Sequence, residues 1–306
     1  MDSNGSYDVI IIGGGPAGLT AGLYASRAGL KTMLLERGIF GGQIVNAQLV
    51  DNYPAFPEGI PGTELGELMH QHAIKYGLES ATTEVTGVSM RHPYQVSTTD
   101  GDIQARSIII ASGSEYSKLG VAGEEELMGR GVSYCATCDG FFFRNQDVAV
   151  VGGGDTAITD ALELAEHCRK VYLIHRRDQL RATKALQAKA FSQPKMEFIW
   201  NTVVEKLEGD KKLNALRLRD VKTGEPSTLE VNGVFVAVGL SPNSRLFSNL
   251  VKLNEIGFVT TDELMRTSTP GVFAAGDVRQ NSARQVITAA GDGAVAATSA
   301  FKYLRE

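Results

Sequence analysis

The chain has 306 residues, 43% of them hydrophobic, which is enough for about two domains with separate cores. Its formal net charge of −5 provides no broad basic surface, so the composition argues against nucleic-acid binding. No apolar stretch approaches the roughly 20 residues that span a bilayer, and residues 1–7 lack the basic start and apolar run of a secretory signal. We therefore expect neither a nucleic-acid nor a membrane partner.

A first dinucleotide-binding signature lies near the N-terminus. Residues 9–12 predict a β-branched strand that enters Gly-Gly-Gly-Pro-Ala-Gly at 13–18, and residues 19–28 predict an apolar helix. The glycines allow the backbone to approach a pyrophosphate, whose charge then lies at a helix N-terminus. The next predicted strand, 31–35, ends at Glu36, where a carboxylate can bind a ribose diol and would repel a 2′-phosphate.

Cys135-Ala136-Thr137-Cys138 carries the expected chemistry. A thiolate attacks in disulfide exchange, and the two-residue spacer lets the second cysteine resolve the mixed disulfide. Half of a zinc site is the competing interpretation, which is disfavoured because only one such motif exists and the five histidines show no matching spacing. Asp139 is a candidate general acid for the departing thiolate, with an ordinary helix cap as the alternative. We expect no metal site.

Cys168 and the aromatic run Phe141-Phe142-Phe143 give two further expectations. Three cysteines, two in one short motif, favour a reducing compartment, so we expect a cytoplasmic protein in which Cys168 is a core or partly buried residue. Side chains alternate along a strand, so at least one phenylalanine should be exposed and could anchor a protein partner, with Arg130 adding a polar contact. Alternatively, all three pack inside as the chain enters the strand at Val148.

A second signature predicts a second nucleotide. Residues 148–151 predict a strand that enters Gly-Gly-Gly-Asp-Thr-Ala at 152–157, and the following strand, 171–174, ends in His-Arg-Arg at 175–177, with Arg181 one turn later. Guanidinium groups suit a phosphate dianion, so this copy should prefer NADPH to NADH. The alternative is that these arginines are solvated surface residues.

The two signatures are expected to lie in nested domains. Residues 108–113 close the first unit, and residues 234–239 repeat their pattern in the second. A buried strand at 271–275 and a small-residue helix at 285–301 follow; they are too little for a third domain and are therefore assigned to the first. We predict a discontinuous domain of residues 1–115 and 244–306, and an inserted domain of residues 116–243. Its linkers, near 114–118 and 239–245, could act as a hinge.

The order and spacing of the motifs at 135–140, 152–157 and 175–177, with Gly-Gly-Gln at 41–43 and Gly-Asp-Val at 276–278, resemble the bacterial low-molecular-weight NADPH-dependent thioredoxin reductases. These are FAD-containing members of the pyridine nucleotide-disulfide oxidoreductase family. The resemblance implies an α/β protein with two Rossmann-like three-layer domains, the NADPH domain being inserted into the FAD domain. It also implies a homodimer that passes electrons from NADPH through FAD and the cysteine pair to thioredoxin.

The resemblance also assigns site residues. For FAD they are Gly13, Gly15, Pro16, Ala17, Gly18, Glu36, Arg37, Gly42, Gln43, Asn52, Val85, Gly113, Asp277, Val278, Arg284, Gln285 and Val286. For NADPH they are Gly152, Gly154, Asp155, Thr156, Ala157, His175, Arg176, Arg177, Arg181 and Gly239. The catalytic residues are Cys135, Cys138 and Asp139, with Cys138 placed beside the flavin. One departure is the loop at 279–283, which lacks the aromatic residues found in some relatives.

Two alternative functions remain open. The acceptor could be a peroxidase system or a quinone, although peroxidase-type reductases carry an added thioredoxin-like module and none precedes Tyr7 here. A non-catalytic flavin redox sensor is disfavoured, because both cofactor motifs are complete and the dithiol is intact.

Overall fold

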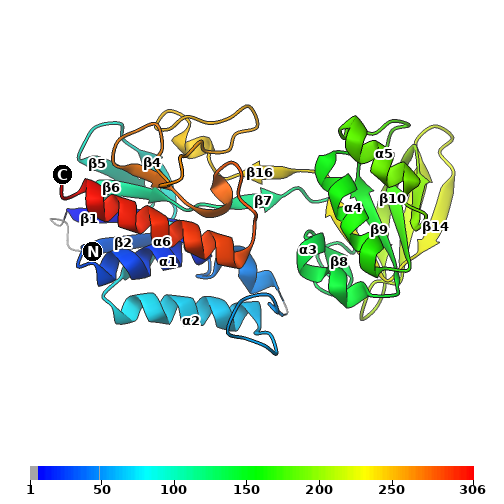
Figure 1. Cartoon of the computed structure of the whole chain (residues 1–306), viewed down its shortest axis with the longest axis horizontal. Helices are drawn as coiled ribbons and strands as arrows, with labels where there is room; N and C mark the ends of the chain where they lie inside the picture. Colours follow the sequence, from blue (N-terminus) through cyan, green and yellow to red (C-terminus); the bar gives the residue numbers. More distant parts are fainter. Residues whose placement is uncertain (1–5, 48) are drawn as a thin grey trace. The chain divides into compact units, whose positions relative to one another are not determined.

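The computed structural model describes residues 6–47 and 49–306, so most of the polar segment expected at 1–7 lies outside the described residues (Figure 1). The chain divides into two compact units: unit 1 is Met1–Glu115 with Ser241–Glu306, and unit 2 is Tyr116–Leu240. The later boundary falls three residues before the expected one, because Asn243 already bonds to unit 1. Its N–H donates to the Gly113 carbonyl at 3.0 Å.

Unit 1 contains a mixed sheet in which five strands are parallel. Their hydrogen-bonded order is β3 (Glu79–Thr82), β2 (Thr32–Glu36), β1 (Tyr7–Ile12) and β6 (Gly101–Ile110), and β17 (Val272–Ala274) also pairs with β6. The first half of β6 instead continues an antiparallel meander with β4 (Val85–Val88) and β5 (Tyr94–Thr98). The long strand β6 therefore joins the parallel sheet to a second β layer.

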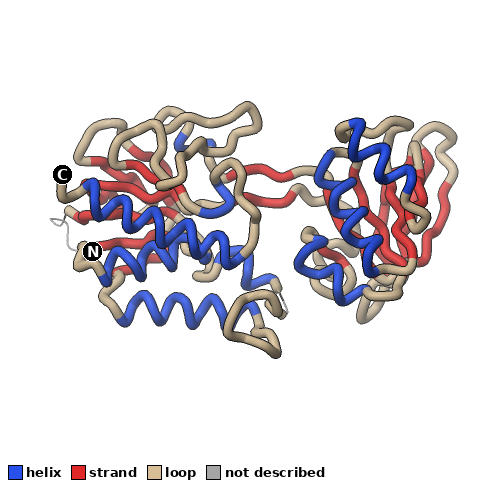
Figure 2. Tube along the Cα trace, viewed as in Figure 1, coloured by secondary structure: helices blue, strands red, loops and turns tan. Residues whose placement is uncertain are grey.

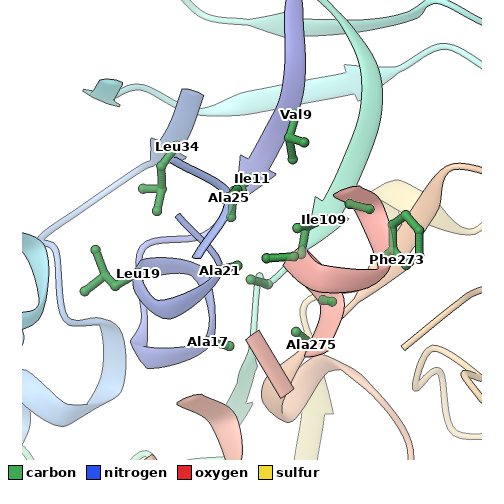
Figure 3. Packing of buried hydrophobic residues seen from close by; sticks show 14 of the residues in the cluster. Val9, Ile11, Ala17, Leu19, Ala21, Ala25, Leu34, Ile109, Phe273 and Ala275 are labelled. Carbon is green, nitrogen blue, oxygen red and sulfur yellow. The ribbon is translucent and has the colours of Figure 1, made fainter. Parts of the chain in front are cut away.

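Helices α1 (Pro16–Arg27) and α6 (Val286–Tyr303) run side by side over one face of this sheet, next to α2 (Gly62–Lys75) (Figure 1). Val9 and Ile11 point to this helical face, whereas Ile10 and Ile12 point to the meander. Figure 3 shows Ala17, Ala21 and Ala25 of α1 in the helical core. The two helices pack closely because their contacts are small: a Cβ on Gly293 would lie 2.1 Å from the Ala17 carbonyl oxygen.

Unit 2 is a three-layer domain built on a parallel sheet of order β11 (Met196–Ile199), β10 (Lys170–Ile174), β9 (Asp147–Gly152), β15 (Gly233–Ala237) and β8 (Val132–Ser133). Helices α4 (Asp155–His167) and α5 (Lys184–Ser192) cover one face. An antiparallel meander of β12 (Thr202–Glu208), β13 (Ala215–Asp220) and β14 (Pro226–Glu230) covers the other (Figure 2). The predicted α/β class with two Rossmann-like three-layer units is confirmed.

The two connections between the units pair with each other. Strand β7 (Ser114–Tyr116) and strand β16 (Leu240–Pro242) form a two-stranded sheet, and the Ser117 N–H then donates to the Gly239 carbonyl at 3.0 Å. Short 3₁₀ turns complete the chain at η1 (Gly42–Asn46), η3 (Arg245–Phe247) and η4 (Gly276–Val278). Among residues 6–47 and 49–306, no helix is long and apolar enough to cross a membrane.

One local expectation is wrong. The aromatic run was expected to continue as a strand, but it forms a 3₁₀ turn, η2 (Gly140–Phe143), directly after the short helix α3 (Ala136–Asp139). Strand β9 begins only at Asp147. The turn forms because the Arg144 N–H bonds back to the Phe141 carbonyl at 3.2 Å. Cys168, at the C-terminal cap of α4, is 1% exposed and belongs to the core, as expected.

Candidate active site

Unit 1 holds a cavity of about 980 Å³ at the carboxyl ends of its parallel strands. Ile12 ends β1, Glu36 ends β2 and Ala275 follows β17, and all three line it. This edge of a parallel sheet is where nucleotides bind in doubly wound folds. Among the residues predicted for FAD, the cavity is lined by Gly13, Gly15, Pro16, Ala17, Glu36, Arg37, Gly42, Gln43, Val85, Gly113 and Asp277.

Gly13 and Gly18 of the first glycine loop have no room for a side chain. Gly13 has a φ of +110°, and a Cβ there would lie 2.3 Å from the Ala111 carbonyl oxygen. A Cβ on Gly18 would lie 1.8 Å from the Gly13 carbonyl oxygen. Gly18 does not line the cavity. Because it has no side chain, the first turn of α1 can pack closely against the glycine loop. The glycine loop therefore exposes backbone at the N-terminus of α1, which fits the pyrophosphate of a dinucleotide.

Glu36 holds the same loop from the end of β2. Its Oε2 accepts a hydrogen bond from the Gly14 N–H at 2.6 Å, and its Oε1 accepts one from the Gly38 N–H at 2.8 Å. The carboxylate is therefore fixed at the position where a ribose diol would lie in this fold. The neighbouring Arg37 bonds to Glu115 at 2.5 Å, and both residues line the cavity.

Asp277 closes the other end of the cavity. Burial raises the pKa of this carboxyl, and the Ser282 hydroxyl, which donates to its Oδ1 at 2.8 Å, opposes that rise. The turn is anchored by a partly buried bidentate pair between the Arg279 guanidinium and Asp292 of α6, at 2.6 and 2.8 Å. Asp277 is thus held as a hydrogen-bonding group suited to the ribityl hydroxyls of a flavin.

Several residues assigned to FAD do not line this cavity. Asn52 instead donates to the Gln285 side-chain oxygen at 3.1 Å, Val278 is fully buried, and the Arg284 guanidinium lies 5.8 Å from the centre of the Phe258 ring. The residues outside the lining are Gly18, Asn52, Val278, Arg284, Gln285 and Val286.

The cavity also contains residues that were not predicted. Ser112 and Asn243 bond to each other, because the Ser112 hydroxyl donates to the Asn243 carbonyl at 2.7 Å and the Asn243 amide donates to the Ser112 carbonyl at 3.0 Å. Ser112 lies in the segment 108–113, whose pattern recurs at 234–239, and this repeat was a signal that could have identified it. Thr83, which follows β3 and also lines the cavity, stands in no motif and had no sequence signal.

The cysteine pair lies in unit 2, directly after β8. Cys135 and Cys138 form a disulfide, and their Cα atoms are 5.3 Å apart. Cys135 caps the N-terminus of α3, where the Cys138 N–H donates to its sulfur at 3.2 Å. Within the described residues, no group of three or more His, Cys, Asp or Glu side chains is placed to hold a metal ion.

Ser133 holds both ends of this motif and was not predicted. It is 5% exposed at the end of β8. Its hydroxyl oxygen accepts from the Cys135 N–H at 3.0 Å and lies 2.6 Å from the Asp139 Oδ2, to which the hydroxyl donates. Asp139 is the last residue of α3 and the N-cap residue of η2, where its side chain makes no capping hydrogen bond.

A buried carboxylate supports the residue before the motif. Glu124 is 2% exposed, and its two oxygens accept from the Leu119 and Gly120 N–H groups at 2.9 and 2.8 Å. The Tyr134 hydroxyl donates to the same carboxylate at 2.6 Å, and burial, with Glu124, raises the pKa of this phenol. The Tyr134 ring also stacks on Tyr116 of β7. The dithiol loop is thereby tied to the start of the inserted unit.

The second glycine loop lies at the carboxyl end of β9. A Cβ on Gly152 would lie 2.5 Å from the Ala237 carbonyl oxygen, whereas a Cβ on Gly154 would meet nothing within 4 Å. Helix α4 begins at Asp155, so Gly154 leaves open space above a helix N-terminus, as a pyrophosphate requires. The Asp155 carboxylate accepts from the Thr183 N–H at 2.7 Å. Thr156 belongs to the first turn of α4, and Ala157 is fully buried beneath the loop.

His175 and the three arginines take different roles. His175 is 6% exposed, its Nε2 lies 3.1 Å from the Gln179 carbonyl oxygen, and its ring packs against Gly153, so it supports the loop from beneath. Burial lowers the pKa of this imidazole. Arg176, Arg177 and Arg181 are exposed, and in the described part of the chain none of them forms an ion pair. Three exposed guanidinium groups therefore follow the end of β10.

The aromatic turn exposes two of its three rings. Phe141 is 61% exposed and Phe142 is 46% exposed, whereas Phe143 packs edge-on against Phe235 with ring centres 5.4 Å apart. The expected exposure is confirmed, and the alternative in which all three pack inside is wrong. In the 3₁₀ turn two consecutive rings are exposed and the third is packed, whereas in a strand consecutive side chains would point to opposite faces.

Comparison with known proteins agrees with this geometry. The family model for pyridine nucleotide-disulphide oxidoreductases matches residues 7–293. The chain is 47% identical to the thioredoxin reductase of Bacillus subtilis, over all of this chain and 97% of that protein, and 49% identical to that of Listeria monocytogenes, over 98% and 94%. The crystal structure of thioredoxin reductase from Streptococcus pyogenes is 44% identical, covers 99% of both chains and superposes with a TM-score of 0.95. The chain belongs to the pyridine nucleotide-disulphide oxidoreductase family.

Proposed function

We propose that this chain is a thioredoxin-disulfide reductase, an enzyme that passes electrons from NADPH through FAD and the Cys135–Cys138 pair to oxidised thioredoxin. The observation that carries the proposal is the disulfide itself, held at the start of α3 in a domain that also carries a nucleotide loop. The full-length relatives named thioredoxin reductase support the acceptor.

Unit 1 would bind FAD and unit 2 would bind NADPH. Bound FAD would supply the two-electron carrier between the nicotinamide and the disulfide. The backbone from Gly13 to Ala17 would face its pyrophosphate, Glu36 its ribose and Asp277 its ribityl chain. Gly239 follows β15, at the same sheet edge as Gly154, and would lie near the bound NADPH.

The dithiol reaction is an exchange of disulfide bonds. A thiolate of the reduced pair attacks the disulfide of thioredoxin, so that one bond forms to the protein substrate and the substrate disulfide breaks. Asp139 gives a proton to the departing sulfur. The second cysteine then closes the Cys135–Cys138 bond and releases the other substrate thiol. Two electrons leave the pair, and one dithiol of thioredoxin is produced.

Each turnover would require two arrangements of the units. The dithiol and the NADPH loop both belong to unit 2, whereas the FAD cavity belongs to unit 1, and one flavin must exchange electrons with both. The paired linkers β7 and β16 would be the hinge. A verified crosslink between the units should permit either flavin reduction by NADPH or flavin oxidation by the disulfide. Full turnover of the crosslinked protein would contradict this motion.

The exposed ring of Phe141 would anchor thioredoxin beside the dithiol. Phe141→Ala should raise KM for thioredoxin severalfold and leave the reduction of a small dye disulfide near wild type. Phe143→Ala is the control for damaged packing and should weaken both activities. Equal losses for Phe141→Ala with both substrates would exclude docking.

We also propose a cytoplasmic homodimer without nucleic-acid binding. Helices α1, α2 and α6 carry exposed apolar side chains, namely Tyr24, Leu68, Ile74 and Ile287, which a second copy could cover. Sedimentation should give twice the mass of one chain. Leu68→Asp should shift that mass toward the monomer.

The decisive experiment follows NADPH oxidation by the FAD-loaded protein, with and without thioredoxin. Steady turnover should require thioredoxin and should disappear in Cys138→Ser, whereas Cys168→Ser should retain activity. Turnover that persists in Cys138→Ser, or that responds only to a quinone or a peroxidase partner, would overturn the proposal.

A further inference from the structure

The side chain of Ser133 forms hydrogen bonds with both Cys135 and Asp139. Its hydroxyl has one proton, and two acceptors lie within reach: the Asp139 Oδ2 at 2.6 Å and the Cys135 carbonyl at 3.3 Å. A carboxylate is the stronger acceptor and is also the nearer one. The proton therefore points to Asp139, while the oxygen accepts the Cys135 N–H at 3.0 Å.

We propose that Ser133 is a positioning residue that prepares Asp139 to protonate the departing sulfur. A donor on Oδ2 disfavours a proton on that same oxygen, so the acidic proton of Asp139 is directed to Oδ1. The Cys135 N–H polarises the serine hydroxyl and strengthens its bond to the carboxyl group. Because Ser133 ends β8 and is almost fully buried, this chain of hydrogen bonds is fixed to the sheet.

The role rests on the proposed function of the cysteine pair. In the exchange, the thiolate attacks the substrate disulfide, the substrate S–S bond breaks, and the proton passes from Asp139 to the sulfur that leaves. Ser133 neither gains nor loses a proton over the reaction. The electron balance is that of the dithiol, which is oxidised while the substrate disulfide is reduced.

Acidic residues on the neighbouring helix would be unchanged by a substitution at Ser133. Helix α4 packs against α3 and carries Asp160 and Glu163, and the Glu163 carboxylate accepts from the Thr137 hydroxyl at 3.0 Å. Tyr134, which precedes Cys135 in the chain, donates its hydroxyl proton to Glu124. A shift seen only on removal of the Ser133 hydroxyl is therefore assigned to the Ser133–Asp139 contact.

The test is single-turnover oxidation of the pre-reduced chain by two disulfide probes. Attack on hydroxyethyl disulfide expels an aliphatic thiolate, which needs a proton. Attack on dithiobis-nitrobenzoate expels an aromatic thiolate, which is stable without one. Ser133→Ala should slow the aliphatic probe about tenfold, the loss expected for one hydrogen bond to a charged group, and move its pH profile by about one unit. The aromatic probe should stay within about twofold, because its departure needs no acid.

Matched variants keep the proposal falsifiable if Ser133→Ala does not fold. Ser133→Thr retains the hydroxyl and should restore the rate, whereas the similarly shaped Ser133→Val should not. In an Asp139→Asn background, Ser133→Val should cause no further slowing. Equal slowing of both probes, or additive effects with Asp139→Asn, would overturn the role of Ser133. Failure of the wild-type chain to reduce either probe would instead count against the proposed function.

Discussion

The two glycine loops share one backbone plan but differ at the residue that ends the following strand. In unit 1 that residue is Glu36, whose oxygens are held by the Gly14 and Gly38 N–H groups. In unit 2 the strand β10 ends at Ile174, and the next residues are buried His175 and then Arg176 and Arg177, which are exposed. Each of the two units thus has a glycine loop that fits a pyrophosphate. We propose that the charge after each of these strands decides whether a 2′-phosphate is repelled or bound.

The largest expected effect comes from the third small position of the loops. Gly18→Ala places a Cβ 1.8 Å from the Gly13 carbonyl oxygen, which is backbone and cannot move aside. We expect a loss of about 3 kcal/mol in the free energy of unfolding and failure to retain FAD. Urea denaturation and flavin absorbance measure both. The matched change in unit 2, Ala157→Gly, should cost about 1 kcal/mol, and an equal cost at both sites would show that the loops do not differ in packing.

The next effect concerns nucleotide choice. Each charge-assisted contact to a phosphate is worth about 1.5 to 3 kcal/mol, so neutral residues at Arg176 and Arg177 should raise KM for NADPH tenfold or more. KM for NADH should change little, because NADH lacks the 2′-phosphate. Steady-state kinetics with both nucleotides measures the ratio, and the exposed Lys189→Ala serves as the control. Equal increases for both nucleotides would remove the arginines from the phosphate site.

A smaller effect is expected at the corresponding position of unit 1. Glu36→Gln leaves one neutral acceptor where two charged oxygens each accepted a backbone N–H, so one of the two hydrogen bonds is lost, and FAD binding should weaken roughly fivefold, equivalent to about 1 kcal/mol. Flavin fluorescence during dialysis measures the affinity. Glu84→Gln, which also lines the cavity, should leave the affinity unchanged. If both changes weakened FAD binding equally, the hydrogen bonds of Glu36 to the loop would not contribute specifically to FAD binding.

The smallest effect is a dependence of stability on pH. Burial lowers the pKa of His175 from 6.5, so the unfolded chain takes up a proton before the folded chain does. The stabilisation from neutral His175 is therefore complete above about pH 6.5 and declines as the pH falls below that value. His175→Gln should flatten this decline in urea midpoints, whereas exposed His72→Gln should not. His70 of unit 1, whose pKa burial also lowers, keeps part of the slope in either variant.

The repeated elements could be predicted because their signals are local. The strands at 9–12 and 148–151, the glycine loops and the cysteine pair each stand within a few consecutive residues, and the structure places them as expected. The positions of Glu36 and of the arginines could be predicted from where the strand after each glycine loop should end. The inserted arrangement also follows from sequence, because a single strand and helix after residue 271 cannot form a core by themselves.

The supporting contacts could not be predicted, because they depend on how distant or unmarked residues meet. Thr83 reaches the cavity only through the pairing of β3 with β2. Glu124 looks like one of several exposed acids in its segment, yet it is buried under Tyr134. The aromatic run was assigned an alternating pattern, but a 3₁₀ turn follows the cysteines. Gly18 lies outside the cavity lining, and its close packing against Gly13 depends on how α1 meets the loop.

The most direct measurement counts the thiols that appear when the FAD-loaded, disulfide-containing protein is titrated with nucleotide in the absence of oxygen. Burial raises the pKa of Cys168 to about 11, so this thiol should stay unreactive near neutral pH. NADPH should produce two alkylated cysteines per chain, mapped to Cys135 and Cys138, at a concentration at least tenfold below that required for NADH. The same two thiols at equal concentrations of NADPH and NADH, or no new thiols with NADPH, would contradict the account.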